Sequence, residues 1–151
     1  MKATYKIPEL NKMRSVRDLS LLSHNQWQNP MVKGMYVDSF RKDNPFEVRY
    51  KEAKRIKEKY PSRIPVICQR SHNSDLDTIA KTKYLVPKDL TATQFLFIIR
   101  KRLKLPSEKG VFLFVNNIIA SSNSTMMDLY ESCRDPDGFL YAFYTEENVF
   151  G

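Results

Sequence analysis

The spacing of apolar positions changes along the chain, and each change of period predicts a new element. Residues 44–47 combine an N-cap candidate, Asn44, with a proline at the first helical position and a glutamate at the third. One face of the segment that follows is apolar and carries Phe46, Ala53, Ile56 and Tyr60. Lysines cover much of the remainder and Pro61 follows, so the pattern predicts an amphipathic helix that ends there.

Two short apolar runs come next, and they predict strands of different kinds. Residues 64–69 are continuously apolar up to Cys68, which is typical of a buried strand. Residues 83–87 are short, rich in β-forming side chains and closed by Pro87, which favours an edge strand. A capping box at 91–94 then opens a second helix before Pro106. Its apolar stripe consists of Phe95, Ile98, Ile99 and Leu103.

The last third of the chain predicts three further strands and one short helix. Residues 111–115 and 118–119 read as strands around a turn at Asn116 and Asn117. Thr125 can cap a helix through Tyr130, and residues 135–138 turn into a final strand over 139–144. The resulting order resembles the β-grasp pattern of ubiquitin, an α+β fold, here with an additional N-terminal helix or helices.

The N-terminal segment differs from the rest, so we expect two parts: an extension over 1–34 and a ubiquitin-like domain over 35–151. Polar residues separate apolar positions spaced by threes, namely Leu10, Met13, Val16, Leu19 and Leu22. Apolar positions spaced strictly by three do not stay on one face of a helix with 3.6 residues per turn. A flexible tail is therefore the main expectation and a short amphipathic helix the alternative. A membrane or partner helix, a targeting segment or an added sequence also stay open.

Composition fits one folded domain plus a tail and adds one constraint. The chain has 151 residues, of which 42% are hydrophobic and 28% charged, enough for a single core. Neither a membrane-spanning apolar stretch nor a secretory signal is present, so we expect a cytoplasmic protein. The net charge of +8 suggests an anionic partner: nucleic acid, an acidic membrane surface or an acidic peptide.

A search for chemistry yields no catalytic residue, cofactor or metal site. The four glycines form no phosphate-binding loop, and Cys68 and Cys133 fit neither a zinc spacing nor a disulfide framework. His72 could approach Cys68, but a small hydrophobe in a core strand explains that cysteine better. A nucleic-acid site is not expected either, because Phe46 and Tyr60 are predicted on the apolar helix face, away from bases.

Seven short segments, taken in order, carry a resemblance to a known family. They are residues 63–68, 83–87, 89–91, 99–102, 112–116, 137–141 and 147–151. They resemble the autophagy ubiquitin-like modifiers of the GABARAP and microtubule-associated light-chain family, from about Tyr36 to Gly151. The resemblance implies a non-enzymatic modifier that activating and conjugating enzymes attach to phosphatidylethanolamine, and that a cysteine protease processes and releases. It also implies work in autophagosome formation and cargo-receptor recruitment, in the cytoplasm and on autophagosomal membranes.

The resemblance assigns roles to individual residues. Gly151 would accept the lipid, and Phe150 would be read by the processing protease. A first pocket, for the aromatic side chain of an aromatic-x-x-aliphatic peptide motif, would consist of Glu52, Ile56, Pro65, Ile67, Lys83, Leu85 and Phe139. A second pocket, for the aliphatic side chain, would consist of Tyr84, Val86, Pro87, Leu90, Phe95, Ile98, Ile99 and Arg102.

Two alternatives to these assignments stay open. Core packing alone would also explain Phe95 and Ile98. An unconjugated adaptor that bridges cargo or cytoskeleton is the alternative function. The sequence itself supports peptide capture, because an edge strand over 83–86 has unpaired backbone groups to which an extended peptide can add.

Overall fold

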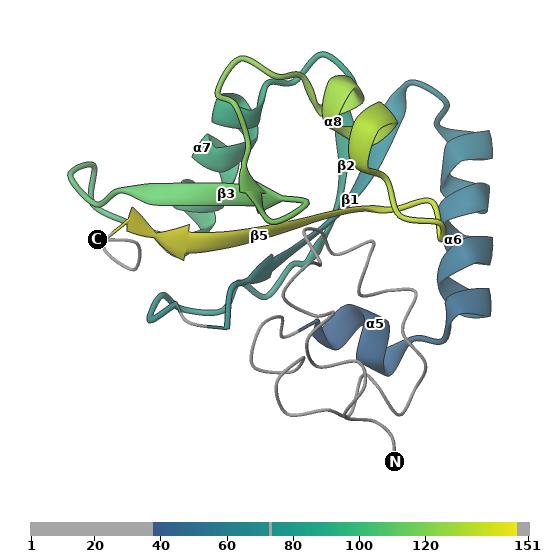
Figure 1. Ribbon diagram of the computed structural model, residues 1–151, viewed down its shortest axis with the longest axis horizontal. Helices are drawn as coiled ribbons and strands as arrows, with labels where there is room; N and C mark the ends of the chain where they lie inside the picture. The colour runs from purple at the N-terminus through teal and green to yellow at the C-terminus, as the bar shows by residue number, and fades with distance from the viewer. Residues whose placement is uncertain (1–37, 73, 148–151) are drawn as a thin grey trace, which may run out of the picture.

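The computed structural model describes residues 38–72 and 74–147, in which helices and strands follow the predicted order. The helices are α5 (Ser39–Asp43), α6 (Phe46–Lys59), α7 (Ala92–Leu103) and α8 (Met126–Cys133). The strands are β1 (Arg63–Arg70), β2 (Lys83–Pro87), β3 (Val111–Val115), β4 (Ile118–Ile119) and β5 (Leu140–Glu146). The predicted α+β class and β-grasp order are confirmed, and in the described part of the chain α5 and α6 precede the first strand (Figure 1).

The strands form one mixed sheet in the order β2-β1-β5-β3-β4. The central pair, β1 and β5, is parallel, with Val66 opposite Leu140 and Arg70 opposite Tyr144. The pairs β1–β2, β3–β5 and β3–β4 are antiparallel. Among the described residues β2 pairs only with β1, so the predicted edge position of this strand is confirmed.

Each face of the sheet carries its own hydrophobic core. The first core lies between the sheet and α7 with α8, and Phe95, Ile99 and Met126 are its helical contributions. The second core lies between the sheet and α6, where Ala53 and Ile56 pack on alternate residues of β1 and β5 such as Ile67 and Tyr141. Figure 1 shows α7 and α8 on one side of β3 and β5, and α5 on the other. The period-two alternation of strand side chains therefore divides the core residues between two helical layers.

Both threonine caps are as the sequence predicts. Thr91 and Thr125 each accept a hydrogen bond from the backbone N–H three residues later, and each takes part in a complete capping box. The two caps lie side by side, because Thr91 and Thr125 form an isolated antiparallel bridge. Helix α8 extends three residues beyond the predicted Tyr130, to Cys133.

The predicted N-cap at Asn44 is wrong. Helix α6 is capped by Pro45, which provides no side-chain hydrogen bond, whereas Asn44 is the C-cap of the short helix α5. The Asn44 amide donates to the carbonyl oxygen of Phe40 at 2.9 Å. The sequence pattern missed α5, and a polar residue between two adjacent helices can cap either one.

The predicted burial of Phe46 and Tyr60 is also wrong. Their side chains are 45% and 41% exposed, because they lie at the two ends of α6, beyond the cover of the sheet. Phe46 stacks on Tyr50, with ring centroids 5.9 Å apart. Because both rings are exposed, their predicted burial can no longer be used to exclude a nucleic-acid partner.

Several predictions lie outside the described residues. These are the character of residues 1–34, including the apolar positions from Leu10 to Leu22, and the roles of Phe150 and Gly151. Within the described part of the chain, no helix is long and apolar enough to cross a membrane.

Candidate functional site

Within the described part of the chain, the backbone of β2 presents unpaired groups along the edge of the sheet. The Cys68 N–H donates to the Thr82 carbonyl oxygen at 2.8 Å, and the β1–β2 register continues with Val66 opposite Tyr84 and Ile64 opposite Val86. Hydrogen-bonded and non-hydrogen-bonded pairs alternate in an antiparallel ladder, so the N–H and C=O groups of Lys83 and Leu85 point away from β1. Among the described residues the Leu85 carbonyl is reached only by the exposed Arg63 side chain, at 3.4 Å.

The residues of the predicted first pocket lie together on the α6 face of this edge. Ile56, Ile67 and Phe139 are buried members of the second core. Lys83 forms an ion pair with Glu52 of α6, and both side chains are partly accessible. Leu85 is 36% exposed and follows Lys83 on the same face of β2. The set therefore has a buried apolar floor, a charged border and one exposed aliphatic side chain at the strand.

The residues of the predicted second pocket other than Pro87 lie on the opposite face, toward α7. Tyr84 and Val86 are buried there, and the Tyr84 ring meets Phe95 edge-on with centroids 5.5 Å apart. The Arg102 guanidinium lies 5.6 Å from the Tyr84 ring. Burial raises the pKa of Tyr84 to about 12, and its hydroxyl donates to the carbonyl oxygen of Lys81 at 2.8 Å.

The other members of the second set differ in accessibility. Leu90 and Ile98 are partly buried against the first core, whereas Phe95 and Ile99 are fully buried in it. Pro87 is exposed at the end of β2 and lies on the same face of the strand as Lys83 and Leu85, not with Tyr84 and Val86. The accessible residues on this side are therefore Leu90, Ile98 and Arg102.

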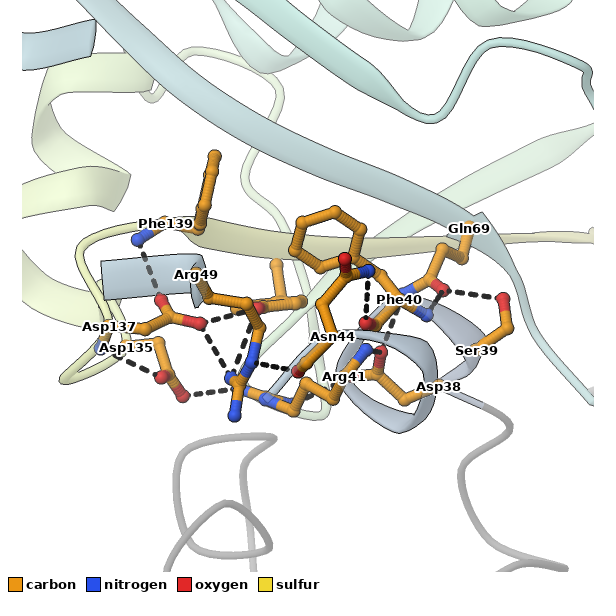
Figure 2. A network of polar contacts seen from close by, with 11 residues as sticks. Asp38, Ser39, Phe40, Arg41, Asn44, Arg49, Gln69, Asp135, Asp137 and Phe139 are labelled. Atoms are coloured by element: carbon orange, nitrogen blue, oxygen red, sulfur yellow. Dashed lines mark hydrogen bonds and ion pairs between the residues drawn. The ribbon is translucent and has the colours of Figure 1, made fainter. Parts of the chain in front are cut away.

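A buried network of charges holds α5 and α6 in place beside the first set (Figure 2). Arg49 of α6 donates to Asp137 at 2.7 Å, and the Tyr141 hydroxyl donates to the same carboxylate at 2.5 Å. Arg41 of α5 pairs with Asp38 and with Asp135, and its guanidinium lies 3.7 Å from the centre of the Tyr141 ring. These contacts join both helices to the turn that leads into β5.

Sequence reasoning missed this network, although one signal pointed to it. Arg49 precedes Ala53 by four residues and Ile56 by seven, so it lies on the buried face of α6. A charged residue on an apolar face is rarely left unpaired. The acidic turn with Asp135 and Asp137 was a candidate partner.

The described residues offer no support for a thiol nucleophile at Cys68. Its side chain is fully buried, and burial raises the pKa of the thiol far above its ordinary value. A thiol of this kind is not ionised at neutral pH. His72 lies on the exposed loop after β1. No group of three potential metal ligands occurs in the described part of the chain.

The structure corrects the predicted end of the final strand. The final strand was expected to end at Tyr144, but β5 continues through Glu146 because Thr145 and Glu146 pair with Phe112 and Val111 of β3. Both residues are buried. The Glu147 N–H then donates to the Gly110 carbonyl oxygen at 2.9 Å. Backbone pairing with β3 therefore extends the strand over these two positions although their side chains are polar.

A mixed sheet in this order, crossed by α7 and ending in a strand beside its parallel partner, defines a ubiquitin-like protein. Residues 48–151 match the family model described as autophagy protein Atg8, ubiquitin like. The chain therefore belongs to the Atg8 family, the ubiquitin-like modifiers of autophagy. The resemblance of the seven sequence segments is confirmed at the level of the family.

Individual relatives agree with this assignment. The chain is 50% identical to autophagy-related protein 8d of Arabidopsis thaliana over 117 residues, which cover 78% of this chain and 98% of that protein. It is 51% identical to autophagy-related protein 8 of Candida albicans over 112 residues, 74% of this chain and 83% of that protein. The crystal structure of Trypanosoma brucei ATG8 superposes with a TM-score of 0.70 at 37% identity, covering 73% of this chain and 95% of that one.

Proposed function

We propose that this protein is conjugated through Gly151 to phosphatidylethanolamine and that its β2 edge captures short aromatic-x-x-aliphatic motifs of cargo receptors. One observation carries the peptide-binding part. The open backbone groups of Lys83 and Leu85 lie between two residue sets on opposite faces of the sheet edge. Family membership supports the conjugation part.

The spacing of the peptide motif fits this arrangement. Successive side chains of an extended peptide point to opposite faces, so residues separated by three positions also point to opposite faces. A peptide added to β2 would thus direct its aromatic residue toward the set around Ile67 and its aliphatic residue toward the set around Ile98. Backbone hydrogen bonds to Lys83 and Leu85 would fix the register.

The affinity should be modest. Burial of two large apolar side chains contributes about 1.5 to 3 kcal/mol each, and ordering of a flexible peptide offsets part of that gain. Dissociation constants of about micromolar order follow. The accessible cations Lys83 and Arg102 favour motifs that are flanked by acidic residues. Such motifs would be an anionic partner of the kind that the net charge of +8 suggests.

Conjugation requires an activated carboxyl group at Gly151. Its carboxylate would attack ATP and release pyrophosphate, and the acyl group would pass from AMP to enzyme cysteines as a thioester. The amine of phosphatidylethanolamine would then displace the thiol to form an amide. A glycine suits this role because it has no side chain to obstruct a narrow enzyme channel. Phe150 would be the residue that a processing cysteine protease reads.

The lipid would dominate membrane attachment. Basic residues near an anionic membrane contribute about 1 kcal/mol each. Buried acyl chains contribute about 0.8 kcal/mol per CH₂, and two chains suffice for stable anchoring.

The conjugation proposal is tested with purified activating and conjugating enzymes, ATP and phosphatidylethanolamine liposomes. We expect mass spectrometry to find the lipid on Gly151, and the protein to float with the liposomes. The variant Gly151→Ala should keep its circular dichroism spectrum and lose flotation. Flotation of that variant with the lipid attached elsewhere would refute the assignment. A wild-type protein that binds receptor peptides without conjugation would instead support an adaptor.

The docking proposal is tested with Leu85→Arg, which places a charge on the exposed aliphatic position of β2. We expect at least a tenfold loss of affinity for an aromatic-x-x-aliphatic peptide in isothermal titration calorimetry, since about 1.4 kcal/mol or more of apolar contact is removed. Ile118→Arg is the matched control, because Ile118 is 65% exposed on the opposite sheet edge. Equal affinities of the two variants would exclude docking at β2.

A further inference from the structure

The last residue of β5 is a buried carboxylate at the point where the chain leaves the sheet. Glu146 is 3% exposed and pairs with Val111 of β3. None of the ion pairs among the described residues involves this side chain. An uncompensated buried charge is unfavourable, so its stabilisation must come from hydrogen bonds.

Those hydrogen bonds come from a loop far away in sequence. The Ser74 hydroxyl donates to Glu146 Oε2 at 2.9 Å, and the Asp75 N–H lies 3.1 Å from Oε1 and 3.2 Å from Oε2. Ser74 is itself held, because its oxygen accepts from the Leu76 N–H at 3.1 Å. Hydrogen bonds to an ionised acceptor are among the stronger ones, so this contact fastens the end of β5 to the loop after β1.

The next residue is fastened on the other side. The Glu147 backbone N–H donates to the Gly110 carbonyl oxygen at 2.9 Å. The chain therefore leaves the domain between two fixed points, the 74–76 loop and Gly110.

We infer that Glu146 is a positioning residue that fixes where the segment leading to Gly151 leaves the domain. This inference rests on the proposed conjugation through Gly151. The four residues after Glu147 can span at most about 14 Å when extended. An enzyme that binds the domain and takes up Gly151 in its active site therefore tolerates only a small change in the point where this segment begins. If β5 frayed at Glu146, the segment would be longer and would leave in another direction.

The test compares Glu146→Ala with Glu146→Gln and Glu147→Ala in the full chain. The glutamine keeps an acceptor oxygen for Ser74 and Asp75, whereas the alanine removes both acceptors. Glu147→Ala is the matched control, because it removes a neighbouring exposed carboxylate and keeps the backbone bond to Gly110. The readouts are kcat and KM for thioester formation on the activating enzyme, and hydrogen exchange of the Glu147 amide.

For Glu146→Ala we expect kcat to fall about tenfold or more, because misplacement of a reacting group lowers the rate after docking. KM should stay within twofold, the Glu147 amide should exchange faster, and receptor-peptide affinity at β2 should be unchanged. Glu146→Gln should restore most of kcat, and Glu147→Ala should behave as wild type. Wild-type conjugation combined with unchanged kcat in Glu146→Ala would overturn this inference alone. Failure of the wild-type protein to form the thioester would overturn the proposed function.

Discussion

Removal of the Arg49 guanidinium should loosen α6 from the sheet and reveal how much of the fold depends on the network in Figure 2. The Arg49 side chain is 10% exposed and the Asp137 side chain is fully buried, at an N–O distance of 2.7 Å. Arg49→Met would retain most of the apolar stem, and among the described residues it would leave the Asp137 carboxylate its hydrogen bonds from Tyr141 and the Phe139 N–H and the nearby charge of Arg41.

The expected loss is large because one charge of a buried pair remains. Removal of one partner of a buried ion pair destabilises a protein by about 3 to 5 kcal/mol. The retained hydrogen bonds to Asp137 favour the lower end, about 3 kcal/mol, and a domain of this size should then unfold roughly 10 °C lower or more. Urea denaturation followed by circular dichroism gives the free energy of unfolding.

Two further variants separate the ion pair from general damage. The double variant Arg49→Met with Asp137→Asn should lose less than the sum of its single variants, with a coupling energy of about 1 to 3 kcal/mol. Arg55→Met on the exposed face of α6 should change stability by no more than about 0.5 kcal/mol. A loss below about 1 kcal/mol in Arg49→Met would refute the reasoning, since the pair would then not be what fastens α6.

Two further outcomes follow from burial. A thiol reagent should modify the partly exposed Cys133 in the native protein and reach Cys68 only after unfolding. Mass spectrometry of the alkylated peptides measures both reactions, and rapid modification of Cys68 in the native protein would contradict its burial. Burial raises the pKa of Tyr84 from 10.0 to about 12 and also raises that of Tyr144, so the unfolded chain loses these protons first. The buried Cys68 thiol acts in the same direction from its ordinary pKa of about 9. Stability should therefore fall as the pH rises from about 9 toward 12, and urea midpoints that stay constant over this range would exclude the effect.

The elements that sequence reasoning predicted well are those with a local cause. Thr91 and Thr125 cap their helices through hydrogen bonds within three residues. The apolar run over residues 64–69 predicts a strand that is buried on both faces of the sheet, as β1 is. The edge position of β2 followed from its length and from Pro87. The two pocket sets came from the family resemblance, and their role in binding a peptide stays a prediction.

The early end predicted for the last strand and the missed Arg49 network share a different cause, which is contact between distant segments. Glu146 looks like tail because it is polar, yet Ser74 and Val111 supply its partners from other parts of the chain. Arg49 looks like part of a solvated helix surface, yet Asp137 lies 88 residues later in the sequence. No local period reports on such pairs. Only the excess of charge on a buried face signals that a partner must exist.

The fold also separates the two proposed activities in space. The β1–β2 and β1–β5 registers place Leu85 level with Phe139, seven residues before Glu146, and two strands to the side. At about 3.3 Å per residue and 4.8 Å per strand, the peptide edge lies roughly 25 Å from the exit of the chain at Glu146. The five residues after Glu146 span at most about 17 Å, so Gly151 cannot reach Leu85 on the β2 edge of its own domain. Attachment to a membrane through Gly151 would therefore leave that edge free for a receptor peptide.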